Sequence, residues 1–222
     1  MLMDSKESEV GINHSNKSSE RGILGNGSSP EARFIEDHSQ LGEYVEALRI
    51  LKQRIVLTSG TFDLLHVGHA RYLEEAKSHG DILIVGVDSD EKVRKRKGPS
   101  RPVVPEGERV DMLAHLRSVD IITLKRPSDA RWELIRLIKP DTLVITQEMY
   151  DDDTKKELDK ICGNVICLEP QATTSTSAKI RLMQVGWSKE VEEPVERILD
   201  QHAATPELRR AIGKILTGRR DG

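Results

Sequence analysis

Short apolar runs alternate with amphipathic stretches along most of the chain. From residue 54 onward, apolar runs rich in β-branched residues predict strands at 55–58, 82–87, 121–124, 142–145 and 165–168. Between and after them, helical spacing predicts helices near 70–78, 106–117, 129–138, 152–161 and 177–185. This alternation is typical of right-handed βαβ units. We therefore predict an α/β fold, a Rossmann-like, doubly wound parallel sheet of about five strands with N- and C-terminal helical extensions.

The two ends of the chain have other patterns. Residues 1–30 are rich in Ser, Gly and charge, which predicts a disordered tail. Residues 31–53 predict an amphipathic helix that packs on the following domain or on a second subunit, so a homodimer is one possibility. Its stripe consists of Leu41, Tyr44, Val45, Leu48 and Leu51. After a main domain at 54–185, residues 186–222 predict a C-terminal helical tail, with Thr205 and Pro206 at one helix start.

Composition narrows the class of protein. The chain has 222 residues, of which 32% are charged and 3% aromatic, with a formal net charge of -3. This balance predicts a cytoplasmic protein with an aliphatic core and gives no reason to expect nucleic-acid binding. No apolar run approaches the roughly 20 residues of a membrane helix. Cys162 and Cys167 are the only cysteines, and we expect both to be reduced; no zinc-site spacing occurs.

The candidate chemistry begins directly after the first predicted strand. There the chain reads Ser59-Gly60-Thr61-Phe62-Asp63-Leu64-Leu65-His66-Val67-Gly68-His69 and leads into a predicted helix. Unpaired backbone N–H groups and the helix dipole make such a strand-turn-helix junction an anion site. His66 and His69 fall on one helical turn, and Gly68 between them lets a phosphate approach the backbone. This pattern predicts a nucleotide-handling loop.

The same stretch resembles the G-x-F-D-x-x-H-x-G-H motif of the cytidylyltransferase-like nucleotidyltransferases. The similarity continues through residues 80–90, the segment 96–103, Pro105 and Arg109, and covers roughly residues 52–185. In this order the segments most resemble the adenylyltransferase domain of heptose-1-phosphate enzymes. The resemblance implies transfer of NMP, with ATP favoured over CTP, to a phosphorylated small molecule such as a sugar 1-phosphate. Pyrophosphate leaves, and Mg²⁺ is carried with the nucleotide rather than by a protein metal site.

The resemblance also implies roles for individual residues. His66, His69 and Lys97 would be catalytic, with the histidines at the triphosphate and Lys97 against phosphates. Without the resemblance, the run 92–97 looks like a solvated basic loop. The implied nucleotide-binding residues, in a loop, a helix start and a hydroxyl-rich segment before the last helix, are Gly60, Thr61, Phe62, Arg109, Ser175, Thr176 and Ser177.

One segment departs from the resemblance. Where heptose-type enzymes usually carry a Gly-Gly-Asp-Tyr-like segment, this chain reads Thr146-Gln147-Glu148-Met149-Tyr150. We expect Gln147 to contact the base there. The departure leaves two alternatives open: a CTP-dependent polyol-phosphate cytidylyltransferase or FAD synthetase, and a catalytically silent nucleotide-binding regulatory module.

Overall fold

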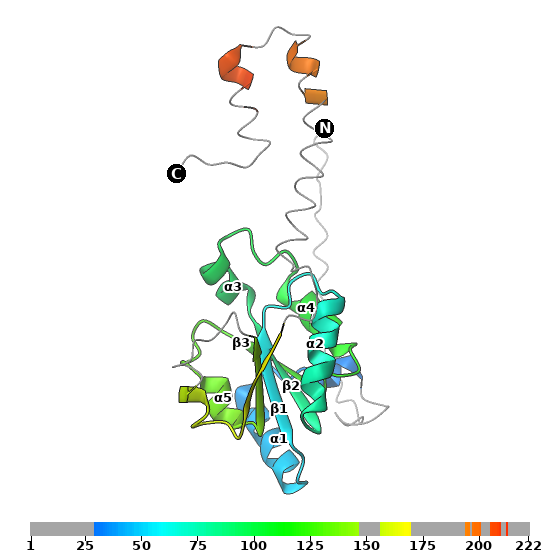
Figure 1. The fold of residues 1–222 in the computed structure, drawn as a ribbon, viewed down its shortest axis with the longest axis vertical. Helices are drawn as coiled ribbons and strands as arrows, with labels where there is room; N and C mark the ends of the chain where they lie inside the picture. Colours follow the sequence, from blue (N-terminus) through cyan, green and yellow to red (C-terminus); the bar gives the residue numbers. More distant parts are fainter. Residues whose placement is uncertain are drawn as a thin grey trace, which may run out of the picture.

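A five-stranded parallel sheet forms the centre of the molecule (Figure 1). In this computed structural model the described residues are 29–146, 156–169, 194–195, 197–200, 205–209 and 212. The strands are β1 (Ile55–Gly60), β2 (Ile82–Asp88), β3 (Ile121–Lys125), β4 (Thr142–Thr146) and β5 (Val165–Leu168). Their order is β3-β2-β1-β4-β5, and every pair is parallel. The predicted Rossmann-like sheet is confirmed, with strands at the expected places.

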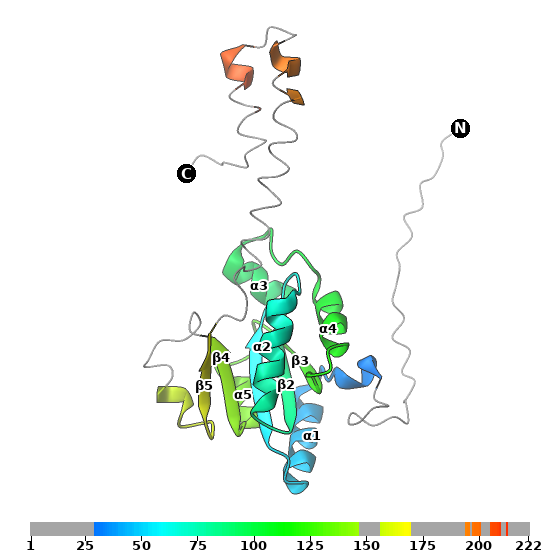
Figure 2. The same cartoon turned by 45° about the vertical axis from the view of Figure 1, so that its right-hand side comes forward.

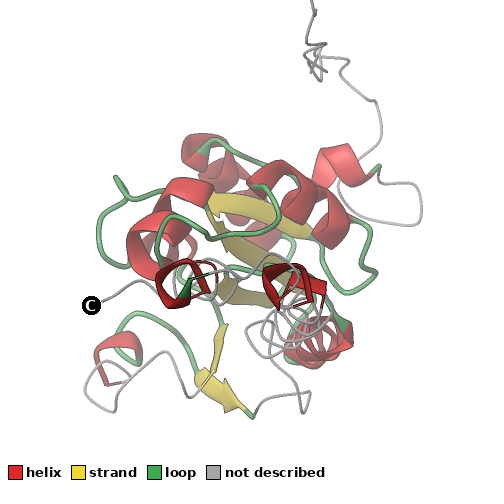
Figure 3. Ribbon diagram, turned by 90° about the horizontal axis from the view of Figure 1, so that it is seen from above, coloured by secondary structure: helices red, strands yellow, loops and turns green. Residues whose placement is uncertain are grey.

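Helices cover both faces of the sheet (Figures 2 and 3). On one face, α2 (Val67–Ser78) and α4 (Glu106–Ala114) bury apolar side chains against alternate strand residues such as Val56 and Val85. On the other, α1 (His38–Ile50) and α5 (Glu133–Ile138) pack on Leu57 and Ile84. Near-continuous burial of β1 and β2 explains why they read as unbroken apolar runs, since parallel strands are covered on both sides.

The segment before β1 is part of this core. A 3-10 helix at Pro30–Arg33 is followed by a bridge between Phe34 and Ile122 of β3. The Arg33 guanidinium donates to the carbonyls of Ala114, Leu116 and Val119, at and after the C-terminal end of α4. In α1, the buried stripe Leu41, Val45 and Leu48 packs on the sheet, as the pattern predicts. Leu51 lies outside α1 and is 62% exposed, so it does not belong to that stripe.

The basic run at 92–97 is helical, which corrects its interpretation as a loop. It belongs to α3 (Asp90–Lys97), whose N-cap Ser89 accepts a hydrogen bond from the Lys92 backbone N–H. Acidic residues occupy the first turn and basic residues the last, which favours the helix through its dipole. The helix ends at Gly98, whose φ of 94° is a backbone conformation that glycine adopts readily and other residues rarely adopt. The apolar pattern gave no helical signal because only Val93 is buried.

Two other helices are shorter than predicted. α5 begins at Glu133 rather than near residue 129, because Trp132 before it has a left-handed backbone with a φ of 63°. α4 ends at Ala114 rather than near residue 117. Residues 156–158 are helical within the predicted 152–161 segment. The predicted helix at 177–185 lies outside the described residues.

Near the C-terminus, residues 206–209 are helical, and the Leu208 backbone N–H donates to the Thr205 hydroxyl. This is the cap that the sequence predicts. In the described part of the chain, none of the helices is long and apolar enough to cross a membrane.

Candidate active site

The candidate site lies where the strand order reverses. β1 pairs with β2 on one side and β4 on the other, so the chain leaves β1 at a switch point of the sheet. In open parallel sheets, ligands bind outside the carboxyl ends of the strands at such a point. The turn at 61–66, the N-terminus of α2 and the start of α3 all follow carboxyl ends of β1 and β2.

The turn after β1 has an unusual backbone. Phe62 and Leu64 have φ angles of 51° and 49°, a left-handed conformation that costs energy for residues other than glycine. The Phe62 ring is buried in the core and lies against Gly60, where an added Cβ would come within 3.0 Å of the ring. Gly60 therefore allows the ring to fold under the turn, and the buried ring anchors the strained loop.

The two motif histidines stack on each other at the start of α2. Their ring centroids are 4.1 Å apart, and the Phe62 ring lies edge-on to His69 at 5.7 Å. His66 is the N-cap of α2, and its Nδ1 accepts a hydrogen bond of 3.1 Å from the Gly68 backbone N–H. Because Nδ1 accepts, the proton of neutral His66 resides on Nε2, which can donate to a phosphate oxygen. The predicted pair is thus brought together with one ring held in a defined tautomer.

Asp63 ties this turn to the loop that follows α3. Its buried carboxylate accepts hydrogen bonds from the Arg101 guanidinium at 2.9 Å and from the backbone N–H groups of Val103 and Val104 at 3.0 Å. A carboxylate with several donors is strongly held. Asp63 belongs to the motif, but its partners are about 40 residues away in sequence, so the pattern alone did not identify this role.

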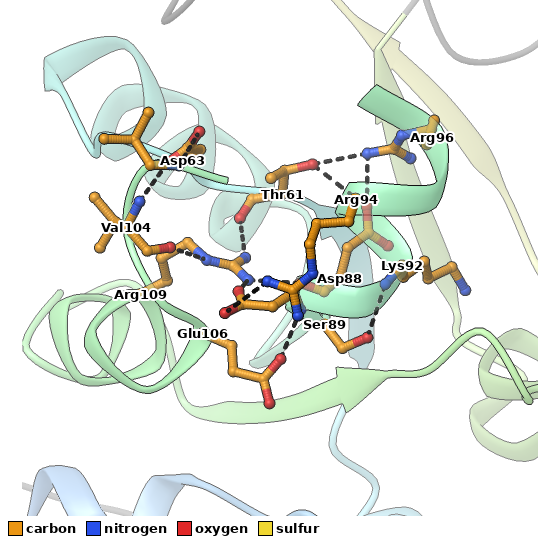
Figure 4. Close-up of polar contacts among 12 residues, drawn as sticks. Thr61, Asp63, Asp88, Ser89, Lys92, Arg94, Arg96, Val104, Glu106 and Arg109 are labelled. Carbon is orange, nitrogen blue, oxygen red and sulfur yellow. Dashed lines mark hydrogen bonds and ion pairs between the residues drawn. The ribbon is translucent and has the colours of Figure 1, made fainter. Parts of the chain in front are cut away.

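A second carboxylate, Asp88 at the end of β2, lies beneath the turn (Figure 4). The Arg96 guanidinium donates to Asp88 at 2.8 Å and to the Thr61 hydroxyl at 2.7 Å. Lys125 of β3 approaches the other Asp88 oxygen at 3.8 Å. Arg96 therefore joins α3 to the motif turn, a contact that sequence analysis missed because it assigned the phosphate role to the neighbouring Lys97.

Arg109 is fully buried below the same turn (Figure 4). Its guanidinium donates to the carbonyls of Thr61, Asp88 and Val104 and to the carboxylate of Asp90. It thereby joins the ends of β1 and β2 to the loop before α4. These four partners give Arg109 a structural role in holding the turn. Its contact with the nucleotide stays a prediction.

Two lysines at the site have lowered pKa values. Burial and the neighbouring Arg96 and Arg101 guanidinium groups lower the pKa of Lys97, at the end of α3. Burial is also the main cause of the lowered pKa of Lys125. Both positions concentrate positive charge at the carboxyl edge of the sheet, as expected for a site that binds phosphate.

The remaining predicted contacts lie outside the described residues, namely Gln147, Ser175, Thr176 and Ser177. Within the described ranges, no three His, Cys, Asp or Glu side chains gather to hold a metal ion. A Mg²⁺ ion carried by a triphosphate does not require such a group, because it is usually held by one or two carboxylates and the phosphates themselves.

With this geometry in view, comparison with known proteins places the chain in a family. A family model described as cytidylyltransferase-like matches residues 57–193, more than half of the chain. The chain therefore belongs to the cytidylyltransferase-like family. The parallel sheet and this family assignment agree with the resemblance of the motif stretch after β1.

Two curated relatives with the same description each match about half of the chain. The chain is 43% identical over 116 residues to a "Bifunctional protein HldE" of Nitratiruptor sp., covering 52% of this chain and 25% of that protein. A protein of the same description from Helicobacter pylori is 47% identical over 122 residues, with coverages of 53% and 26%. The chain thus spans about a quarter of the length of these curated relatives.

A solved structure shows the same fold. A pantoate-beta-alanine ligase from Francisella tularensis aligns with a TM-score of 0.50 at 18% identity, over 65% of this chain and 68% of that one. At this identity the similarity concerns the fold alone.

Proposed function

We propose that this protein transfers NMP from a nucleoside triphosphate to a phosphorylated small molecule and releases pyrophosphate, with ATP and a sugar 1-phosphate as the substrates. The observation that carries the proposal is the stacked His66–His69 pair at the start of α2, beside a turn held by Asp63 and Arg109. The family and the adenylyltransferase-type resemblance support the reaction class.

In the proposed mechanism, an oxygen of the acceptor phosphate attacks the α-phosphorus in line, and the bond from that phosphorus to the bridging oxygen of pyrophosphate breaks. Such a reaction needs alignment and charge stabilisation more than covalent help from the protein. His66 Nε2–H and the His69 ring would stabilise the charge on the α-phosphate oxygens. The positive end of the α2 dipole would add to this stabilisation.

The positive groups at the end of α3 would neutralise the remaining phosphates. Lys97 would contact the triphosphate, while Gly60, Thr61 and Phe62 would line the approach to it. Mg²⁺ would arrive with the nucleotide and neutralise its phosphates. Gln147, Ser175, Thr176 and Ser177 complete the proposed nucleotide-binding set, and we propose the cytoplasm as the location.

Pyrophosphate release by the purified full-length chain tests the proposal. ATP and CTP are each combined with aldose 1-phosphates, glycerol 3-phosphate and FMN. We expect release with ATP and an aldose 1-phosphate, and equal formation of a nucleotide sugar by mass spectrometry. Release only with CTP and glycerol 3-phosphate would favour a polyol-phosphate cytidylyltransferase. Release only with ATP and FMN would favour an FAD synthetase. Nucleotide binding without release for any pair would favour a silent regulatory module.

A further inference from the structure

The last turn of α3 carries four basic residues whose side chains differ in where they bond. Two of them pair with carboxylates one turn earlier in the same helix, namely Arg94 with Asp90 and Lys95 with Glu91. Arg96 instead donates to Asp88 of β2 at 2.8 Å and to the Thr61 hydroxyl of the motif turn at 2.7 Å (Figure 4). Arg96 therefore connects the last turn of the helix to the end of the sheet.

Arg96, Thr61 and Asp88 form a closed set of hydrogen bonds. One nitrogen of Arg96 donates to both partners, and the Thr61 hydroxyl donates to the same Asp88 oxygen at 3.5 Å. The Thr61 oxygen thus accepts one bond and donates another, as a hydroxyl can. The Asp88 side chain is 2% exposed and ends a strand that is paired on both sides, so this carboxylate is a rigid anchor.

The first half of α3 is anchored independently of Arg96. Arg109 binds the carboxylate of the first residue, Asp90, at 2.8 Å, and Val93 is fully buried in the middle of the helix. Directly after the last turn, Gly98 has a φ of 94°, and an added Cβ there would meet nothing within 4 Å. The last turn therefore lies between an anchored half-helix and an open glycine, and Arg96 is its link to the sheet.

Lys97 follows Arg96 directly and lies among like charges. Burial, and then the neighbouring Arg96 and Arg101 guanidinium groups, lower the pKa of Lys97. Cations this close repel one another. Asp88 offsets the charge of Arg96 at 2.8 Å. Asp63 offsets the charge of Arg101 at 2.9 Å. The two ion pairs therefore allow Lys97 to stay beside the motif turn before a triphosphate brings its own negative charge.

We propose that Arg96 is a positioning residue: its bridge to the sheet holds the last turn of α3 so that the Lys97 ammonium meets the triphosphate in the transition state. The inference rests on the proposed function for the role of Lys97. It adds a residue that acts through Lys97 and does not itself touch the substrate. Because a displacement of about 1 Å can cost about 100-fold in rate, loss of the bridge should reduce kcat much more than ATP binding.

The Arg96→Met protein tests the assignment, because methionine keeps an unbranched side chain and removes the bridge. We expect kcat for pyrophosphate release to fall at least about tenfold, while calorimetry gives an ATP Kd within threefold of wild type at an unchanged stoichiometry. The melting temperature should stay within about 3 °C, since Asp88 keeps its contacts with Thr61 and Lys125 and the lost ion pair is half-exposed. Lys95→Met is the matched control: it removes a charge from the same turn but no bond to the sheet, so kcat should stay within twofold.

The same substitution in a Lys97→Met protein shows whether Arg96 acts through Lys97. Effects of residues that act together are non-additive, whereas effects of independent residues multiply. In the Lys97→Met background, Arg96→Met should lower kcat less than threefold. A further tenfold fall in that background, or a kcat within threefold of wild type for Arg96→Met alone, would overturn the assignment. An ATP Kd that rises as much as kcat falls would also overturn it, because Arg96 would then bind the triphosphate itself.

Failure of the proposed reaction gives a different result. If the wild type releases no pyrophosphate with any pair, the proposed reaction is wrong, and the bridge is then judged by hydrogen exchange measured by NMR. The probe is the Gly98 backbone N–H, which donates to the Arg94 carbonyl at 3.0 Å in the last turn. Arg96→Met should speed its exchange at least fivefold, and Lys95→Met should leave it within twofold. Equal exchange in Arg96→Met and wild type overturns the inference.

Discussion

At the scale of single residues, the site depends on buried charges that never touch the reacting atoms in our account. Arg109 holds three backbone carbonyls from separate segments, and Asp63 holds a loop about 40 residues away. These groups allow the strained turn at Phe62 and Leu64 to persist. The histidines are placed by this support rather than by their own helix alone.

Replacing Arg109 should therefore destabilise the protein strongly. Arg109→Met removes the donor to three carbonyls and the nearer of two guanidinium partners of Asp90, so we expect a loss of about 3–5 kcal/mol in the free energy of unfolding. Urea denaturation followed by circular dichroism measures it. The control is Arg94→Met, because Arg94 is half-exposed and also pairs with Asp90. The free energy of unfolding of the Arg94→Met protein should fall by less than about 1 kcal/mol. Equal losses in the two variants would contradict the role given to Arg109.

Some of these residues could be predicted from the sequence, and others could not, for a physical reason. The pair His66 and His69 could be predicted because both residues lie in one local motif. The partners of Asp63 and Asp88 could not, because each contact joins segments that only folding brings together. Arg96 and Lys97 are neighbours in the chain, and nothing local shows which one reaches the turn.

At the scale of elements, the strands were predictable and one helix was not. Buried parallel strands appear as short apolar runs, which is why all five were found. α3 is stabilised by its cap, its charges and Gly98 rather than by an apolar stripe, so the sequence pattern predicts a loop there. α5 starts late because Trp132 takes a left-handed backbone, which no local pattern indicates.

The packing of β1 on the turn before β2 gives a test at this scale. A Cβ at Gly80 would lie 2.6 Å from the Val56 side chain and 2.8 Å from the Arg54 carbonyl oxygen. We expect Gly80→Ala to lower the free energy of unfolding by about 1–3 kcal/mol through overpacking. Gly107→Ala in α4 is the matched control: a Cβ there meets nothing within 4 Å, so stability should hold or rise by up to about 1 kcal/mol. A Gly80→Ala protein as stable as wild type would disprove this packing.

At the scale of the whole molecule, the helix before the main domain is part of the same core. Leu41, Val45 and Leu48 of α1 belong to one cluster with Leu57 and other residues of the sheet. The predicted boundary at residue 54 stays a prediction about domain organisation. The shared core argues that folding requires the residues before it.

Two truncated chains test whether folding requires the residues before position 54. A chain that begins at residue 29 keeps every core residue of α1, and we expect it to unfold within about 2 °C of the full-length protein. A chain that begins at residue 54 exposes the sheet face under α1, so we expect it to lose cooperative unfolding, because each lost core leucine alone costs about 2–5 kcal/mol. Thermal scans by calorimetry compare them. Cooperative unfolding of the shorter chain at the full-length temperature would show that the domain does begin at residue 54.

The central claim is that the stacked histidines stabilise charge at the α-phosphate, and one measurement tests it most directly. Initial rates of pyrophosphate release are compared for wild type and His69→Ala at saturating ATP and acceptor, with the melting temperature of each protein measured in parallel. The account predicts a fall of at least about 100-fold at an unchanged melting temperature. A rate within threefold of wild type, in a folded His69→Ala protein, would contradict it.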